Sequence, residues 1–199
     1  RGLMALAYRR CDSVVDLGAC MRNRLKRYHH GAKEESFPPW ALEEPQAPVA
    51  ADPVARQALF ADAKLALLYS GGFGQGHTFE PFLRLARELR DAPIHFCLAA
   101  RGNRAHLARE AIRPEDVNVS VAPFAPQSEL HKRLGAADIH LASLAENWTG
   151  TIVPSKFFGS LAVGRPVLFA GSPQSEIARL IEEHDVGWVL TKSNGHEIG

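Results

Sequence analysis

The sequence predicts an α/β fold built on a doubly wound, Rossmann-like parallel sheet. From Lys64 onward, short apolar runs rich in Leu, Ile, Val and Ala alternate with longer amphipathic segments. Apolar runs of this kind are typical of strands that are buried on both faces. Their alternation with helices at this spacing favours parallel strands joined by right-handed crossovers. Ligands of such sheets bind in the loops at the carboxyl ends of the strands.

The apolar runs define the expected strands, and the segments between them define the expected helices. The strands are Leu65–Tyr69, Ile94–Ala99, Val117–Val121, Ile139–Leu144, Val167–Ala170 and Val186–Leu190. The helices are Val54–Ala63, Thr78–Arg90, Asn103–Ile112, Ser128–Leu134, one that begins at Pro154 and stops at Gly164, and one that continues to Glu183. For the last helix we expect Ser172 to be the N-cap and Pro173 the first helical residue, where a missing N–H costs nothing.

The beginning of the chain has a different character, and we expect two domains, residues 1–45 and residues 46–199. The first is expected to contain a helix end (Leu3–Arg10), a short strand (Ser13–Leu17) and a basic helix (Cys20–His30). Prolines crowd residues 37–48, which favours a stiff extended linker. The basic helix presents either a solvated face or a surface for acidic lipid headgroups or a phosphate-bearing acceptor.

The composition is that of a globular protein without a strong charge bias. The chain has 199 residues, 46% of them hydrophobic and 23% charged, and a formal net charge of +1. This balance gives no reason to expect a nucleic-acid partner. The three cysteines are scattered, and no run approaches the roughly 18 apolar residues that span a bilayer. Because the chain begins at Arg1 without a signal peptide, we expect a piece of a longer cytoplasmic protein.

The stretch from Glu146 to Gly171 is the most informative part of the chain. It is expected to form a polar loop, a helix, a tight turn and a buried strand. Ser155 and Lys156 fall in the first helical turn, beside N–H groups that the helix cannot use itself. A cation is unfavourable at that end of the helix dipole. Lys156 is therefore easier to explain if an anion binds there.

This stretch closely resembles the carboxyl-terminal half of retaining GT-B glycosyltransferases of family 4. The resemblance rests on Pro154-Ser-Lys-Phe-Phe and on Ala162-Val-Gly-Arg-Pro-Val, and is greatest to the branch that builds bacterial surface polysaccharides. It implies a nucleotide-diphosphate sugar donor, no metal and no cofactor. Many members of the family carry two glutamates eight positions apart, the second of which holds the nucleotide ribose. Here those positions are Thr151 and Gly159, so another residue must contact the ribose.

Three loops at strand ends are candidates for contacts with the donor. Tyr69–Thr78 holds four glycines, which suits either a plain tight turn or a loop whose amides approach a phosphate. The resemblance places the diphosphate at this loop, and places the nucleobase at the turn that follows Val117–Val121. Arg101, after the second strand, is a phosphate or base contact, or else a surface arginine.

The resemblance assigns these loops to the parts of the donor. The expected diphosphate contacts are Gly72, Phe73, Gly74, His77, Ser155 and Lys156. The expected base contacts are Phe124 and Ala125, with Arg101 for base or phosphate, and the alternative for Phe124 is an inward-facing core aromatic. The expected sugar contacts are Glu146, Thr149, Gly150, Thr151 and Ile152. The catalytic histidine of the family lies in the amino-terminal domain, outside this chain, so we expect binding without turnover.

The expected function is transfer of a sugar, with retention, to a polysaccharide, lipopolysaccharide or lipid-linked acceptor. Two alternatives stay open: a GT-B-fold nucleotide-sugar epimerase, and a non-catalytic sugar-nucleotide-binding subunit. The first would need additional acidic and histidine residues in the cleft, and the absent glutamate pair keeps the second open. We expect a cytoplasmic location, with peripheral contact to the inner face of the membrane through the missing domain as a further expectation.

Overall fold

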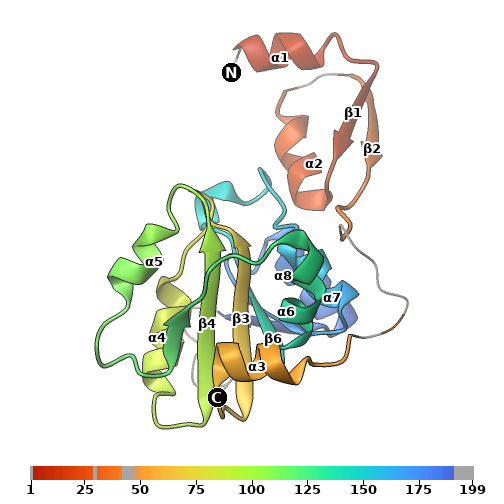
Figure 1. Ribbon diagram of the computed structural model, residues 1–199. Helices are drawn as coiled ribbons and strands as arrows, with labels where there is room; N and C mark the ends of the chain where they lie inside the picture. The colour runs from red at the N-terminus through yellow and green to blue at the C-terminus, as the bar shows by residue number, and fades with distance from the viewer. Residues whose placement is uncertain (1, 29–30, 42–46, 48, 191–199) are drawn as a thin grey trace.

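A computed structural model describes residues 2–28, 31–41, 47 and 49–190. The chain forms two units, joined by the segment that contains the prolines (Figure 1). The first unit holds α1 (Gly2–Tyr8), β1 (Ser13–Asp16), α2 (Ala19–Lys26) and β2 (Lys33–Ser36). Strands β1 and β2 pair in parallel as a two-stranded sheet. In Figure 1 this unit lies beyond the carboxyl ends of β3 and β4.

The first unit agrees with the sequence in most of its elements. Strand β1 and helix α2 lie where they were predicted, although α2 ends at Lys26 and the predicted end at His30 lies outside the described residues. Strand β2 was not predicted, because Lys-Glu-Glu-Ser has no apolar alternation. The buried carboxylate of Asp16 organises the unit, since it accepts hydrogen bonds from the Gly18 N–H (2.9 Å) and Arg22 Nε (2.8 Å).

The second unit is a six-stranded parallel sheet in the order β5-β4-β3-β6-β7-β8. Its strands are β3 (Leu65–Gly72), β4 (Ile94–Arg101), β5 (Val119–Val121), β6 (Ile139–Ser143), β7 (Val167–Ala170) and β8 (Gly187–Leu190). The chain winds outward from β3 to β5 and then returns to β6 on the other side of β3. The predicted doubly wound α/β fold is confirmed, with its switch point between β3 and β6.

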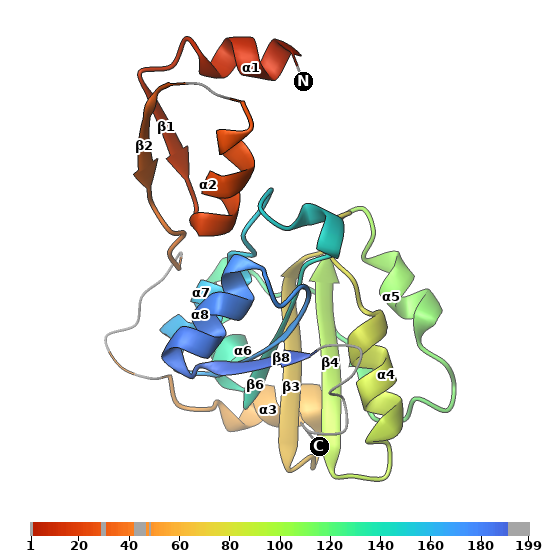
Figure 2. The ribbon, with the colours of Figure 1, turned by 180° about the vertical axis from the view of Figure 1, so that it is seen from behind.

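Helices cover both faces of this sheet (Figures 1 and 2). They are α3 (Pro53–Phe60), α4 (Glu80–Glu88), α5 (His106–Ala111), α6 (Leu130–Gly135), α7 (Lys156–Ala162) and α8 (Glu176–His184), with 3-10 turns η1 (Gln127–Glu129) and η2 (Glu146–Trp148). Two helix starts differ from the expected positions. Helix α7 begins at Lys156 instead of Pro154. Helix α8 is capped by Ser175, not by Ser172, because the Ser172 hydroxyl instead accepts from the Gln174 N–H within a turn.

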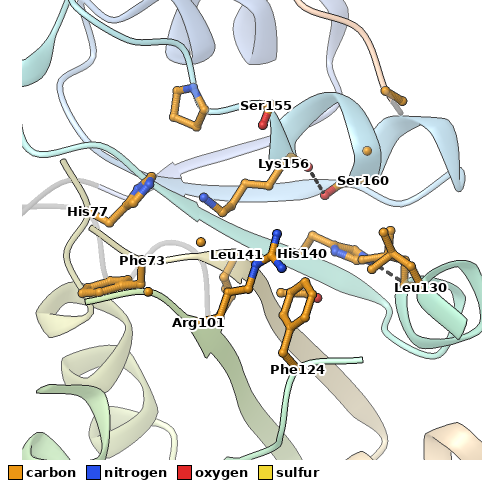
Figure 3. A pocket seen from close by; sticks show the side chains of 18 of the residues that line it. Phe73, His77, Arg101, Phe124, Leu130, His140, Leu141, Ser155, Lys156 and Ser160 are labelled. Atoms are coloured by element: carbon orange, nitrogen blue, oxygen red, sulfur yellow. Dashed lines mark hydrogen bonds between the residues drawn. The ribbon is translucent and has the colours of Figure 1, made fainter. Parts of the chain in front are cut away.

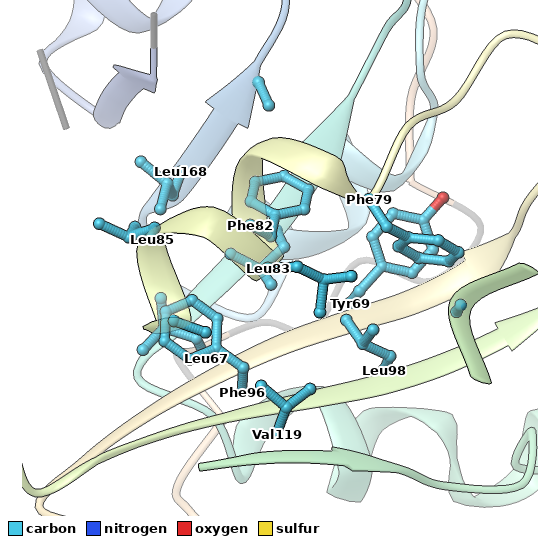
Figure 4. Close-up of a cluster of buried hydrophobic side chains, with 14 of the residues drawn as sticks. Leu67, Tyr69, Phe79, Phe82, Leu83, Leu85, Phe96, Leu98, Val119 and Leu168 are labelled. Carbon is cyan, nitrogen blue, oxygen red and sulfur yellow. The ribbon is translucent and has the colours of Figure 1, made fainter. Parts of the chain in front are cut away.

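Alternate residues of β3 belong to different hydrophobic clusters. Leu67 and Tyr69 pack with α4 in the cluster of Figure 4, whereas Ala66 and Leu68 pack with α3 and α6. A third cluster joins α7 and α8 to β7. Near β5, the buried Asp116 carboxylate accepts hydrogen bonds from both Nε and an Nη of Arg87 on α4, each at 2.8 Å. The sheet is therefore anchored on both faces, and its strand ends can position a site.

Candidate functional site

A cavity of about 680 Å³ opens at the carboxyl ends of the strands, where the fold predicts a ligand (Figure 3). Its walls come from the loops after β3, β4, β5 and β6, from α6 and α7, and from the linker. The lining residues on which the site depends are Trp40, Ser70–Gly74, His77, Arg101, Phe124, Leu130, Ile152 and Ser155–Lys156. Its size lies within the range of small-molecule sites, roughly 300–1,000 Å³.

Glycines let the loop after β3 pack closely against the opposite wall. Gly71 has a φ of +141°, and a Cβ there would lie 3.2 Å from Cε of Lys156. A Cβ on Gly76 would lie 2.8 Å from Cδ1 of Ile152. The carbonyl of Gly76 also accepts a hydrogen bond from the Ala145 N–H at 2.9 Å. The glycine loop is therefore fixed to the segment that follows β6, and is not a plain exposed turn.

Lys156, the first residue of α7, extends into the cavity (Figure 3). Its Nζ lies over the ring of the buried Tyr69, 5.1 Å from the ring centroid, which stabilises the cation. Burial lowers the pKa of Lys156 from 10.5 to about 8. Within the described part of the chain no carboxylate pairs with this lysine, and none lines the cavity. The cavity thus contains a desolvated cation without a counter-charge.

His77, in the loop after β3, lies beside Lys156 of α7 (Figure 3). Its Nδ1–H donates to the carbonyl of Ser143 at 2.8 Å, which fixes the tautomer and leaves Nε2 as an acceptor. Burial, together with the positive charge of Lys156, lowers the pKa of His77. The ring is therefore neutral at neutral pH when the cavity is empty. An anion bound beside both groups would favour their protonated forms.

Arg101 and Phe124 form a flat pair at another part of the wall. The guanidinium carbon of Arg101 lies 4.3 Å from the ring centroid of Phe124, a cation–π contact between the ends of β4 and β5 (Figure 3). The backbone carbonyl of Arg101 accepts the N–H of Phe73 at 2.6 Å. The Phe73 amide is thus already hydrogen-bonded within the protein, and the Phe73 ring is buried by stacking on Phe79.

The structure brings most of the predicted contacts together. Those that line the cavity are Gly72, Phe73, Gly74, His77, Arg101, Phe124, Ile152, Ser155 and Lys156. Those that lie outside its lining are Ala125, Glu146, Thr149, Gly150 and Thr151. Ala125 is buried and Glu146 is exposed on η2. The roles of all these residues in binding stay predictions.

The loop that is predicted to hold the sugar also contacts α2. The carbonyl of Thr149 accepts from an Nη of Arg24 at 3.2 Å. Gly150 has a φ of +73°, and a Cβ there would lie 2.7 Å from the Cys20 carbonyl. Close by, the buried Glu176 carboxylate accepts from the Cys20 N–H at 3.2 Å. Four basic residues lie on α2 and at its carboxyl end. Two of them make contacts within the protein, since Arg24 donates to Thr149 and Arg22 pairs with Asp16.

Several lining residues were not predicted from the sequence. The Ser70 hydroxyl is buried in the wall and has no hydrogen-bond partner among the described residues, which leaves it free for a ligand. Its position at the end of an apolar strand was the available signal. Leu130 and His131 come from α6 and Trp40 from the linker, and nothing in their local sequence indicates a site. His140 also lines the cavity, and burial lowers its pKa to about 4.

Known proteins resemble this chain in sequence and in fold. No protein-family model matches it. Over 178 residues, which cover 86% of the chain, it is 28% identical to a putative colanic acid biosynthesis glycosyl transferase, WcaI, of Escherichia coli. Over 195 residues, which cover 94%, it is 25% identical to a probable glycosyltransferase, WbjE, of Pseudomonas aeruginosa. The chain spans 43% and 48% of the lengths of these two proteins.

Solved structures share the fold of this chain over almost its whole length. Sucrose-phosphate synthase of Thermosynechococcus elongatus matches 98% of the chain with a TM-score of 0.67 at 12% identity, over 49% of its own length. Anabaena HepE, solved with UDP and glucose, matches 94% with a TM-score of 0.64 at 12% identity, over 51% of its own length. The fold is that of GT-B glycosyltransferases. The Rossmann-like sheet is thus shared with both solved structures, and both sequence relatives carry the name of glycosyltransferase. No helix among the described residues is long and apolar enough to cross a membrane.

Proposed function

We propose that this chain is the donor-binding half of a retaining, metal-independent family 4 glycosyltransferase. It binds a nucleotide-diphosphate sugar in the cavity at the strand ends. Residues 1–45 form the tail of the acceptor-binding domain and the linker, and residues 46–199 form the donor-binding domain. Support comes from the fold, from the Pro154-Ser-Lys motif at the cavity wall, and from relatives named as glycosyltransferases.

The observation that carries the proposal is Lys156, an unpaired, desolvated cation in a cavity whose described lining has no carboxylate. Arg101 adds a second positive charge to the lining, and His77 contributes a nitrogen acceptor that becomes a cation on protonation. A diphosphate supplies the missing counter-charge. When the bond between the sugar and the diphosphate breaks, negative charge develops on the leaving diphosphate. A fixed ammonium in a desolvated site stabilises that charge more than water would.

The acceptor is proposed to be a growing surface polysaccharide, a lipopolysaccharide or a lipid-linked sugar. This rests on the relatives, one of which is named for colanic acid biosynthesis. The catalytic histidine is proposed to lie in the domain that precedes this chain. The chain alone would then bind the donor without transferring the sugar.

Isothermal titration calorimetry of this chain with UDP, GDP, ADP, CMP and dTDP tests the donor site. We expect one nucleoside diphosphate to bind, with EDTA having no effect. Lys156→Ala should weaken its binding about 10- to 100-fold, because a charge-assisted contact is lost. Lys132→Ala, which removes an exposed lysine of α6, is the matched control and should leave affinity unchanged. Equal affinity in both variants contradicts the assignment of Lys156 to the diphosphate.

The reaction itself is tested in the full-length protein with the nucleotide sugar that binds. We expect sugar transfer in which the anomeric configuration of the donor is kept in the product, as followed by proton NMR. An epimerised sugar nucleotide without transfer would support the epimerase alternative. Donor binding with neither transfer nor epimerisation would support a non-catalytic binding subunit.

A further inference from the structure

Trp40, on the linker, lines the cavity while 71% of it is exposed to solvent. The next residue, Ala41, also lines the cavity but is only 8% exposed. The linker therefore packs against the cavity wall at Ala41 and presents the indole at the rim. Farther along, the linker is fixed again, since Arg165 donates to the Val49 carbonyl at 3.2 Å.

Among the described residues, no ring contact or hydrophobic cluster accounts for the position of the indole. Trp40 belongs to none of the three hydrophobic clusters, and no ring or cation–π contact joins it to another described residue. An indole left this exposed keeps a large apolar surface in water. A surface of this kind at the mouth of a cavity is typical of a group that becomes covered when a ligand binds.

The other lining residues indicate which part of a ligand would cover it. The charged and polar groups of the glycine loop and Lys156 suit a diphosphate, as argued above. The lining also contains an apolar group of residues, namely Phe124, Leu130, Leu134 and Val163. At Gly159, a Cβ would meet nothing within 4 Å, so α7 leaves open space in this wall. These apolar side chains form a surface on which the base of a nucleoside can pack, and the described lining has no carboxylate to compete for its hydroxyl groups.

We propose that Trp40 stacks on the nucleobase of the bound nucleoside diphosphate, so that the linker supplies part of the donor site. This inference rests on the proposed function. Trp40 would act as a contact for the ligand and would take no part in the chemistry of transfer. Stacking on an aromatic side chain accepts any base, because every base has a flat π-face. Trp40 therefore contributes affinity for a nucleoside over a bare diphosphate.

Fluorescence of Trp40 tests this contact directly. The chain has three tryptophans, so the double variant Trp148→Phe, Trp188→Phe leaves Trp40 as the single emitter. We titrate it with the nucleoside diphosphate that binds most tightly in calorimetry, and in parallel with inorganic pyrophosphate. Saturable quenching by the nucleotide and none by pyrophosphate is the expected result. Circular dichroism melting of the double variant checks that it is folded.

Affinities of Trp40 variants give a second, independent readout in the otherwise unchanged chain. Trp40→Ala should weaken nucleoside diphosphate binding about tenfold and leave pyrophosphate binding unchanged, whereas Trp40→Phe should keep most of the affinity. If the unchanged chain binds no nucleoside diphosphate, the proposed function fails and this inference fails with it. If the nucleotide binds but Trp40 emission and the affinity of Trp40→Ala are unchanged, only the stacking inference is overturned.

Discussion

Replacing Lys156 with Met should make the ligand-free protein more stable while it weakens diphosphate binding. Burial lowers the pKa of this lysine from 10.5 to about 8, which corresponds to about 3 kcal/mol of unfavourable free energy for the protonated form in the folded protein. The contact with the Tyr69 ring offsets about 1 kcal/mol. Met keeps the length of the side chain without its charge. We therefore expect Lys156→Met to raise the free energy of unfolding by about 2 kcal/mol at neutral pH.

The stability difference between Lys156→Met and the unchanged protein should depend on pH. Between about pH 8 and pH 10.5 the unfolded chain keeps the Lys156 proton that the folded chain has lost. The free energy of unfolding of the unchanged protein therefore rises with pH across this window. The advantage of Lys156→Met should shrink over the same interval and be small above it. Below about pH 8 the lysine is protonated in both states, so the full difference remains.

Urea denaturation followed by circular dichroism, at neutral pH and at about pH 10, measures both effects. Lys132→Met is the control, because Lys132 is exposed on α6 and its loss should change stability by less than about 0.5 kcal/mol. A Lys156→Met variant less stable than the unchanged protein at neutral pH would refute the reasoning. It would mean that Lys156 stabilises the folded protein in the absence of a ligand, and that its charge is not an unfavourable, desolvated one.

Three further predictions follow from contacts described above. Gly71→Ala should weaken diphosphate binding up to about tenfold in calorimetry and cost about 1–2 kcal/mol of stability, because Gly71 has a φ of +141° and its Cβ would lie 3.2 Å from Cε of Lys156, which must shift slightly. Diphosphate affinity should fall as pH rises above about 8, since only protonated Lys156 attracts the anion, and a pH series of titrations measures this. Asp116→Asn should cost about 2 kcal/mol at neutral pH in urea denaturation, because hydrogen bonds from Arg87 hold the pKa of Asp116 at about 2. Since that pKa is depressed, the contribution is present above about pH 4 and is lost as pH falls through about 2, so the two proteins should converge in acid.

The sequence predicted the large sheet well because each of its strands carries its own signal. Buried parallel strands are continuous apolar runs, and helices of matching length lie between them. Strand β2 carries no such signal, because its Lys33–Ser36 side chains are mostly exposed and only backbone pairing with β1 defines it. The start of α8 was misplaced because Ser172 and Ser175 are equally good caps in sequence, and only the turn between them decides.

Some residues of the candidate site could also be predicted from the sequence, and others could not. Residues directly after a strand, such as Arg101 and Phe124, could be placed near the ligand from the sequence, since the carboxyl ends of parallel strands meet at one edge. Leu130 and Trp40 could not be placed there from the sequence, because their position in the lining depends on how α6 and the linker pack. The contact of Thr149 with Arg24, which lies 125 residues away in the sequence, was not predicted either, while its role at the sugar stays a prediction. No local pattern encodes a contact across that separation.

The contact between α2 and the loop after β6 links the two units energetically. It uses backbone groups at Thr149, Gly150 and Cys20 together with the side chain of Arg24, and Glu176 of α8 adds a hydrogen bond from the Cys20 N–H. This loop continues directly into Ile152 and Lys156 in the cavity wall. Coupling free energies are reciprocal. A ligand that binds the cavity more tightly when α2 is docked must therefore strengthen that docking by the same factor, and for such a ligand the position of the first unit would report on occupancy of the cavity.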